Sequence, residues 1–303
     1  MVRRFVTAAL LIAGAPGVAQ AQEGLLVVAH GAGAEWNARV RETVAQVKWE
    51  EGPVGIAFLM GQEKETAGWN AAVAQLVAQG ARRIVVVPLM VSSYGSHYRQ
   101  IRYFAGELAA LPPELAKHDH GSHAPPPVPM RVTAALDDAP ELAATLAARW
   151  AELGEADRRR PLLLVAHGPN DSTDAVTWIA HITAVSQGLR SRTRADLHVA
   201  LLRDDAPADV RNAAVAAMRD SVLAMSRRAA DSVVAMPVMI SAGTITQVKI
   251  PADLDGLPIR YRAEPLAPHP ELARWIERKA GEADITRADA REHPQERIGI
   301  RDQ

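Results

Sequence analysis

The sequence predicts an α/β protein made of two similar domains in tandem, each with a mostly parallel sheet. Short apolar runs rich in β-branched residues alternate with alanine-rich segments of helical period, which is typical of βαβ units. The order of these segments then starts again in the second half of the chain. With 303 residues, of which 48% are hydrophobic, the chain is long enough to bury two such cores.

The first half contains three apolar runs bounded by turn residues, which predict strands at 24–30, 54–60 and 82–90. Segments of helical period predict helices at 35–49 and 66–79, and a third helix after His97. The segment 136–150 then provides a closing strand and a helix that begins with Pro-Glu-Leu-Ala.

The second half repeats this order. Its segments 161–170, 198–205, 232–250 and 266–280 echo, in turn, 24–33, 55–62, 83–101 and 136–150. Because four separate matches keep one order, we infer a duplicated domain rather than chance similarity. The predicted domains are residues 22–155 and 160–281.

The two ends of the chain differ from these domains. Residues 1–21 have a basic start, a short apolar stretch and a small-residue site at Ala19–Ala21, the layout of a cleaved secretory signal. The stretch is too short for a spanning helix, so we expect export, with the bacterial periplasm as destination, and no stable membrane insertion after cleavage. The absence of cysteine fits that compartment. Residues 282–303 are charged and lack an apolar period, so they are predicted to be a flexible tail.

An insertion distinguishes the first half from the second, and its candidate is the proline- and histidine-rich segment 112–129. His118, His120 and His123 could bind a divalent metal weakly, but a solvated loop of biased composition explains them equally well. The net charge of -1 gives no electrostatic footprint for nucleic acid or an anionic membrane. We therefore expect a small molecule or a protein as the partner.

Two histidines follow the ends of predicted strands, where ligand sites lie in open α/β sheets. His30 follows the first strand and His97 follows the third, so their rings can face one cleft if the two strands are neighbours. Imidazole binds cations such as Co²⁺, Ni²⁺, Zn²⁺ and Fe²⁺ and accepts protons near neutral pH. Insertion of a metal into a macrocycle needs both properties, because two pyrrole protons leave as the cation enters. For either histidine alone, an ordinary hydrogen-bonded loop residue is the alternative.

Three other interpretations of this region are weaker. The motif His-Gly-Ala-Gly at 30–33 is similar to the oxyanion loop of some α/β hydrolases, but the chain lacks a G-x-S-x-G nucleophile elbow. A dinucleotide fingerprint would need glycine where Trp36 stands. A phosphohistidine phosphatase would need arginine at Ala29.

The strand-His-Gly opening and three further segments together resemble the class II chelatases of the sirohydrochlorin cobaltochelatase and ferrochelatase group, particularly the duplicated long CbiX form. Those segments are 57–60 with its echo 200–203, 79–101 and 267–280. The resemblance implies two flavodoxin-like halves that face a central cleft, with no nucleotide cofactor. It also implies a divalent metal as substrate, Co²⁺ first with Fe²⁺ and Ni²⁺ as alternatives, inserted into a sirohydrochlorin-type tetrapyrrole of cobalamin or sirohaem biosynthesis.

The resemblance also implies roles for particular residues. His30 and His97 would hold the cation and accept the pyrrole protons. Some family members add an acidic ligand at the end of strand two, where this chain has Met60; Glu63 is the candidate substitute, although the start of a helix explains a glutamate there as well. In the second half Thr246 stands opposite His97, so we expect a single metal site in the first half.

The opposite wall of the cleft would then come from the second half, through His167, Thr244, Thr246 and Lys249. The carboxylates of a tetrapyrrole need cationic partners, for which Arg99, Arg102 and Lys249 are candidates, with solvated helix positions as the alternative.

Two functions follow from this pattern. The first is an exported chelatase; the second is an exported carrier of a metal or a tetrapyrrole on the same fold, without turnover. Loss of the strand-two acid, and an export signal on a pathway whose intermediates are normally cytoplasmic, favour the carrier, whereas retention of both histidines favours the enzyme. Since one chain supplies both walls of the cleft, a monomer suffices for either.

Overall fold

The computed structural model of the protein describes residues 22–111, 115, 125–193 and 196–292. The predicted signal segment, His118, His120 and His123, and the end of the predicted tail lie outside the described residues. Within the described part of the chain, no helix combines the length and apolar character needed to cross a membrane.

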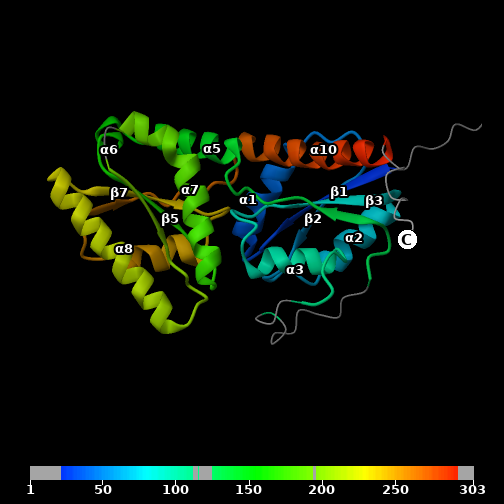
Figure 1. The fold of residues 1–303 in the computed structure, drawn as a ribbon, viewed down its shortest axis with the longest axis horizontal. Coiled ribbons are helices and arrows are strands. Elements are labelled where there is room, and N and C mark those ends of the chain that lie inside the picture. Colours follow the sequence, from blue (N-terminus) through cyan, green and yellow to red (C-terminus); the bar gives the residue numbers. More distant parts are fainter. Residues whose placement is uncertain (1–21, 112–114, 116–124, 194–195, 293–303) are drawn as a thin grey trace, which may run out of the picture.

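The first half forms a four-stranded parallel sheet in the order β2-β1-β3-β4 (Figure 1). Its strands are β1 (Gln22–Ala29), β2 (Val54–Phe58), β3 (Ala81–Pro88) and β4 (Met130–Val132). Its helices are α1 (Ala34–Val44), α2 (Trp69–Ala78) and α3 (Ser96–Phe104). The central strand β1 is fully buried from Leu25 to Ala29, which explains its continuous apolar run.

The second half repeats this sheet in the order β6-β5-β7-β8. Its strands are β5 (Leu162–Ala166), β6 (Leu197–Leu201), β7 (Val233–Val238) and β8 (Ile259–Tyr261). Around them lie α6 (Glu155–Arg158), α7 (Ser172–Thr193), α8 (Ala208–Ala229), the π-helical turn η1 (Ile245–Lys249) and α9 (Ile250–Asp253). The predicted α/β class and the duplication are confirmed.

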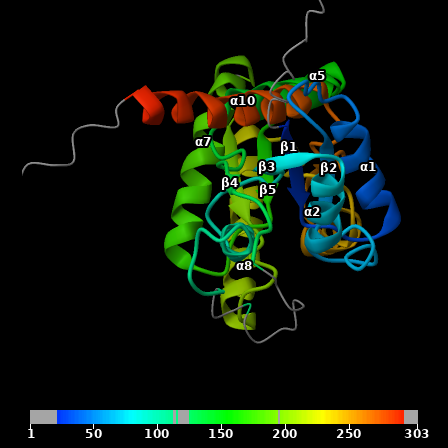
Figure 2. The ribbon, with the colours of Figure 1, turned by 90° about the vertical axis from the view of Figure 1, so that its right-hand side faces the viewer.

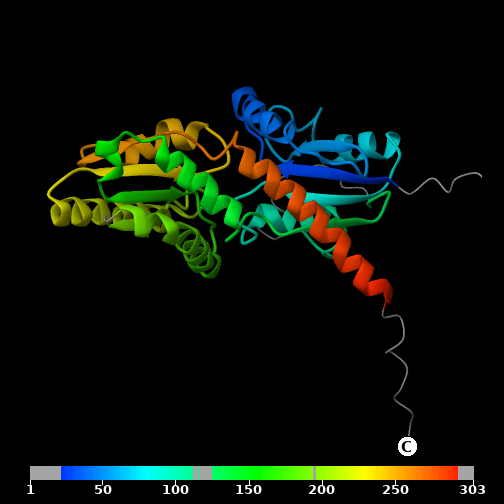
Figure 3. The ribbon, with the colours of Figure 1, turned by 90° about the horizontal axis from the view of Figure 1, so that it is seen from above.

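The closing helix of each half packs on the other half. Helix α5 (Pro140–Ala151) ends the first half in sequence but packs against α7, whereas α10 (Pro270–Glu292) ends the second half but packs against β3 and α1. Figure 1 shows α5 above the second sheet and α10 above the first, and Figure 3 shows α10 crossing the first sheet diagonally. Both helices lie on the same side of the molecule (Figure 2).

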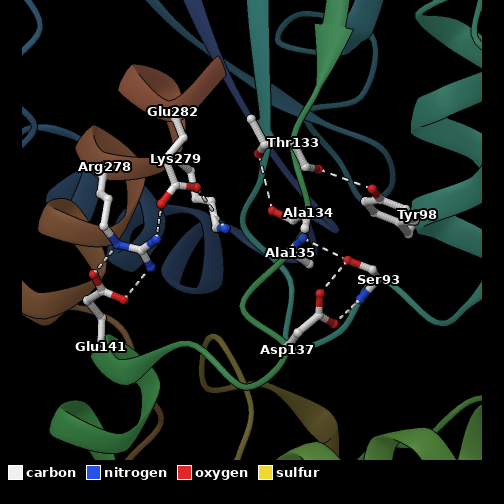
Figure 4. A network of polar contacts seen from close by, with 10 residues as sticks. All are labelled: Ser93, Tyr98, Thr133, Ala134, Ala135, Asp137, Glu141, Arg278, Lys279 and Glu282. Carbon is white, nitrogen blue, oxygen red and sulfur yellow. Dashed lines mark hydrogen bonds and ion pairs between the residues drawn. The ribbon is translucent and has the colours of Figure 1, made fainter. Parts of the chain in front are cut away.

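This exchange of the closing helices does not follow from the sequence pattern. An apolar helix face shows that a helix is covered, but it does not show which of two similar sheets covers it. An ion pair joins the two exchanged helices, since Arg278 donates to both oxygens of Glu141 at 2.6 and 2.7 Å (Figure 4). Helix α10 also runs past residue 281, where the sequence predicts the start of the tail.

One hydrophobic core extends through both halves. It takes Leu25 and Val27 from β1, Leu162 and Leu164 from β5, and Trp275 from α10. The alternate residues of each central strand point to the opposite face, as the period of two requires, and belong to two separate outer clusters. The two sheets are therefore held at a fixed relation by a shared core.

Tertiary contacts shift several predicted helix ends. The helix predicted at 35–49 ends at Val44, and beyond it the Lys48 amide donates to Glu277 at 2.7 Å and the Trp49 indole donates to the Glu23 carbonyl at 2.9 Å. Helix α3 begins at Ser96, so His97 lies in its first turn rather than before it.

Candidate functional site

His30 is the first residue after β1, and a glycine turn sets its direction. Gly31 has φ +82°, and a Cβ on it would come within 2.4 Å of the Met60 carbonyl oxygen. The ring Nδ1 lies 2.8 Å from the Gly31 carbonyl oxygen. Since that oxygen can only accept, Nδ1 carries the proton and Nε2 keeps its lone pair for a cation.

His97 lies in the first turn of α3, directly after β3, which pairs with β1. The ring centroids of His30 and His97 are 4.8 Å apart, with an angle of 83° between the ring planes. His97 Nδ1 lies 3.0 Å from Oε1 of Gln100, which is buried, so the same tautomer leaves its Nε2 open. Anchoring one ring nitrogen so that the other can bind is the usual arrangement of metal-ligating histidines.

The loop that carries His97 is braced from the segment after β4. The amide and the hydroxyl of Ser93 each donate to Asp137, both at 2.7 Å, and the Ala135 amide donates to the Ser93 hydroxyl at 2.8 Å (Figure 4). The Tyr98 hydroxyl donates to the Thr133 carbonyl at 3.2 Å. These bonds hold the first turn of α3 in place next to His30.

Both histidines are held in the neutral form. Desolvation of the ring by its surroundings, and then repulsion by His97, lower the pKa of His30 to about 4, although the residue as a whole is exposed to solvent. Burial also lowers the pKa of His97. A neutral imidazole is the form that binds a cation, but a ring with so low a pKa is a weak base. The lowered pKa values of His30 and His97 therefore suit metal ligands.

His167 repeats the geometry of His30 in the second half. It follows β5, its Nδ1 lies 2.9 Å from the Gly168 carbonyl oxygen, and Gly168 has φ +77°. The Met60 amide donates to the His30 carbonyl at 2.8 Å, and the Arg203 amide donates to the His167 carbonyl at 2.6 Å. Met60 and Arg203, which occupy matching places in the repeat, therefore make the same backbone hydrogen bond in the two halves.

The second half adds an acidic residue that sequence reasoning missed. Asp205 Oδ2 lies 3.5 Å from His167 Nε2, and the charges of both residues act on His30 and His97. The ends of the strands of both halves therefore meet at one junction. The signal in the sequence was the acidic pair Asp204-Asp205 after the second strand of the repeat.

Glu63 is not brought together with the two histidines. Its carboxylate accepts from Asn37 Nδ2 at 2.8 Å and pairs with Arg41, and these two contacts lower its pKa. Buried Asn37 in turn accepts from the Ala32 amide at 3.0 Å. Glu63 thus supports the loop after His30 through Asn37. Among the described residues, Glu63 forms no compact group of metal ligands with His30 and His97.

The predicted wall residues of the second half are engaged within the protein. The Thr246 hydroxyl is buried, accepts from the Gly243 amide at 3.0 Å and donates to the Gly243 carbonyl at 3.1 Å. Lys249 pairs with Asp204, while Thr244 is exposed. Thr246 is therefore a turn-closing residue, which corrects its placement on the wall.

The predicted substrate-binding arginines also have partners. Arg99 of α3 pairs with Asp174 of α7 at 3.0 Å, which links the two halves, and Arg102 pairs with Glu107 at 2.9 Å. Each pair uses one nitrogen of a guanidinium group, which has five N–H donors in all. Sequence position alone does not show such pairs, because Arg99 and Asp174 meet only through the fold.

Aromatic residues close the junction from both halves. The Trp36 ring lies 6.5 Å from that of His30, and the Trp36 carbonyl accepts from the Ser241 hydroxyl at 3.0 Å. The Trp178 indole of α7 donates to the Tyr94 carbonyl. These contacts tie the loops after β3 and β7 to the facing half.

The fold is shared with several solved structures. SirB from Bacillus subtilis with Fe³⁺ is 15% identical with a TM-score of 0.59, and covers 88% of this chain and 98% of its own. The sirohydrochlorin chelatase SirB from Bacillus subtilis subspecies spizizenii in complex with cobalt is 12% identical with a TM-score of 0.60, and covers 88% of this chain and 97% of its own. DR2241 from Deinococcus radiodurans, a multi-domain protein with structural similarity to chelatases, is 18% identical with a TM-score of 0.52; the match covers 93% of this chain and 57% of DR2241.

No curated protein sequence matches this chain. The model of the CbiX family matches twice, over residues 24–153 and 161–283, and so covers both halves of the duplication. The chain therefore belongs to the CbiX family.

Proposed function

We propose that this protein inserts a divalent metal into a sirohydrochlorin-type tetrapyrrole, with Co²⁺ as the first candidate and Fe²⁺ and Ni²⁺ as alternatives. The observation that carries the proposal is the pair His30 and His97, whose rings lie 4.8 Å apart with both Nε2 atoms unprotonated, at the junction of two CbiX-type halves. One solved structure that shares the fold is SirB with Fe³⁺, and another is the sirohydrochlorin chelatase SirB in complex with cobalt.

The site suits a cation that is held briefly and then handed over. Two imidazoles bind borderline cations such as Co²⁺, and they leave other coordination positions open. Pyrrole nitrogens can enter those positions as the metal moves into the macrocycle. Since His30 and His97 are neutral, they need not lose protons before they bind the cation.

The proposal is tested by mixing the purified protein with sirohydrochlorin and Co²⁺ under anaerobic conditions. The absorbance change of metal insertion should be faster than in the same mixture without protein. A rate equal to that of the protein-free mixture would contradict the proposal. One observation favours a carrier instead: Met60 replaces the acid of strand two, and Glu63 is tied to Asn37 and Arg41. Tight binding of metal or tetrapyrrole without insertion would support that second function.

The affinity of the protein for the metal should depend little on pH in the mildly acidic range. Because the pKa of His30 is lowered to about 4 and that of His97 is also lowered, protons compete with the cation only at a pH well below the ordinary histidine pKa of about 6.5. We expect the dissociation constant for Co²⁺, measured without tetrapyrrole, to change little between about pH 7 and pH 5 and to rise on approach to pH 4. A tenfold or greater weakening already at about pH 6 would show that the histidines have ordinary pKa values.

A further inference from the structure

We propose that helix α7 of the second half positions His97, through Asp174, Trp178 and His181. These three positioning residues hold the segment of the first half that presents the His97 ring to the cation. The metal ligands then belong to the first half, but their alignment depends on a helix of the second. This inference rests on the proposed function, in which His97 is a metal ligand.

His97 lies at a helix end that has no capping side chain of its own. It is the second residue of α3, and the residue before that helix, Gly95, makes no side-chain hydrogen bond to the first turn. The first turn of a helix has backbone N–H groups without partners inside the helix, so it is the part that needs support from outside. The angle between the His97 and His30 rings therefore depends on contacts made by the residues around His97.

Two contacts from α7 hold the chain on either side of His97. The Asp174 carboxylate accepts from the guanidinium of Arg99 at 3.0 Å, two residues after the histidine. The Trp178 indole N–H donates to the Tyr94 carbonyl oxygen, three residues before it. Both donors and acceptors come from opposite halves of the duplication. His97 is thus placed between two points that are fixed to the second half.

His181 reaches the same segment from one turn further along α7. Its ring meets the Tyr94 ring edge-on, with 5.6 Å between the ring centroids and 71° between the planes. Its Nδ1 lies 3.6 Å from Oδ1 of Asp137 and can form an ion pair with that carboxylate when the ring is protonated. Asp137 is the residue that accepts from the amide and the hydroxyl of Ser93 (Figure 4). The bracing of the loop before His97 is therefore connected to α7 as well.

Helix α7 is a rigid support for these contacts. The three positioning residues are spaced by four and then three positions, so they lie on one face of the helix. Other positions of α7 are buried in the core that both halves share: Ala175, Ile182, Val185 and Leu189. Helix α5 also packs against α7. The polar face cannot shift without disturbing that core, so it holds the segment around His97 at a fixed place.

The first half uses the matching helix positions differently. In the repeat, Asp174 and Trp178 correspond to Asn37 and Arg41 of α1. Asn37 and Arg41 both contact Glu63 within their own half. The segment of the second half that matches α3 carries a threonine in place of the histidine. The contacts from α7 therefore accompany the half that has a ligand to position.

The test compares the full chain with the double variant Asp174→Asn, Trp178→Phe, which removes the charge and the indole N–H but keeps the side-chain shapes. In the metal-free protein, NMR of the imidazole Cε1–H groups should show a shifted and broadened His97 signal, assigned by its loss in His97→Ala. The signal of His198 on β6 should not change. Titration with Co²⁺ alone should show affinity about tenfold weaker and an altered visible d–d absorption of the ion.

Val176→Ala is the matched control, because Val176 is on the same helix and 69% exposed. It should match the wild type in the His97 signal and in Co²⁺ affinity. An unchanged His97 signal or an unchanged Co²⁺ affinity in the double variant would overturn the inference, even if urea unfolding showed a loss of stability. The contacts from α7 would then stabilise the fold without positioning the ligand.

These measurements are independent of turnover, since no tetrapyrrole is present. A wild type that binds Co²⁺ but inserts none, together with the expected changes in the double variant, would contradict the chelatase and leave the positioning role standing. Metal insertion by the wild type, together with an unchanged His97 signal in the double variant, would contradict the positioning role alone.

Discussion

Replacing both His30 and His97 by alanine should reduce the rate of metal insertion at least about a hundredfold, to the rate of the protein-free mixture. The two rings are the only pair of imidazoles among the described residues found in ring contact, and each presents an unprotonated Nε2. Without them, the described part of the first half has no histidine left to bind the metal. The same variant should lose Co²⁺ binding in the absence of tetrapyrrole.

A matched control separates this effect from a general loss of histidine. His198 lies on β6 outside the junction, and its Nε2 contacts the Ser221 hydroxyl at 3.2 Å. His198→Ala should therefore insert metal at the wild-type rate. Normal Co²⁺ affinity in the His30→Ala, His97→Ala variant would place the metal elsewhere and contradict the assignment.

The lowered pKa of His30 also sets how the stability of the protein depends on pH. The pKa of His30 is lowered in the folded state to about 4, so the unfolded chain binds more protons between that value and the ordinary pKa. His30 therefore makes the wild type less stable as the pH falls through this window. His30→Ala removes that contribution, so the variant should lose less stability than the wild type between about pH 6.5 and pH 4 in urea unfolding.

The pair of histidines was predictable because its origin is local and topological. Each follows an apolar run, and the carboxyl ends of neighbouring parallel strands lie at one edge of a sheet. The pairing of β1 with β3 then brings His30 and His97 together. The apolar runs of β1 and β5 also predicted the buried central strands, since a strand covered on both faces has no polar side.

Other features depend on contacts that the sequence pattern does not show. The position of Thr246 matched that of His97, but the hydroxyl turns inward to close its own turn at Gly243. Glu63 has the right charge for a metal ligand, yet it is paired with Arg41 and Asn37, and among the described residues it belongs to no compact group of ligands with a histidine. The sequence does not reveal the role of Asp205, because only the fold brings this residue to within 3.5 Å of His167.

The exchange of α5 and α10 makes each half depend for its stability on a helix from the other half of the sequence. Trp275 of α10 is fully buried in the shared core, so Trp275→Ala should lower the free energy of unfolding by about 3–5 kcal/mol. Trp275→Phe should cost less, because it keeps most of the apolar volume and removes an indole N–H that has no hydrogen-bond partner among the described residues. Urea unfolding followed by circular dichroism measures both changes.

The sheet that loses amide protection shows whether each closing helix packs on the other half or on its own half. Since α10 packs against β3 and α1, Trp275→Ala should cause the largest loss of amide protection in the first sheet, although Trp275 belongs to the second half of the sequence. Leu146→Ala in α5 is the mirror variant: Leu146 is fully buried, and α5 packs against α7, so its loss of protection should be largest in the second half.

Hydrogen exchange read by mass spectrometry resolves peptides from β1 and β5 and so reports each sheet separately. If Trp275→Ala exposed β5 and left β1 protected, α10 would be covering its own half, and the exchange would be contradicted. The predicted crossed pattern has a physical cause in the shared core, because a cavity weakens first the strands that line it. It also links stability to the site: strand β1 ends at His30, so a loosened first sheet should lower Co²⁺ affinity in Trp275→Ala more than in Leu146→Ala.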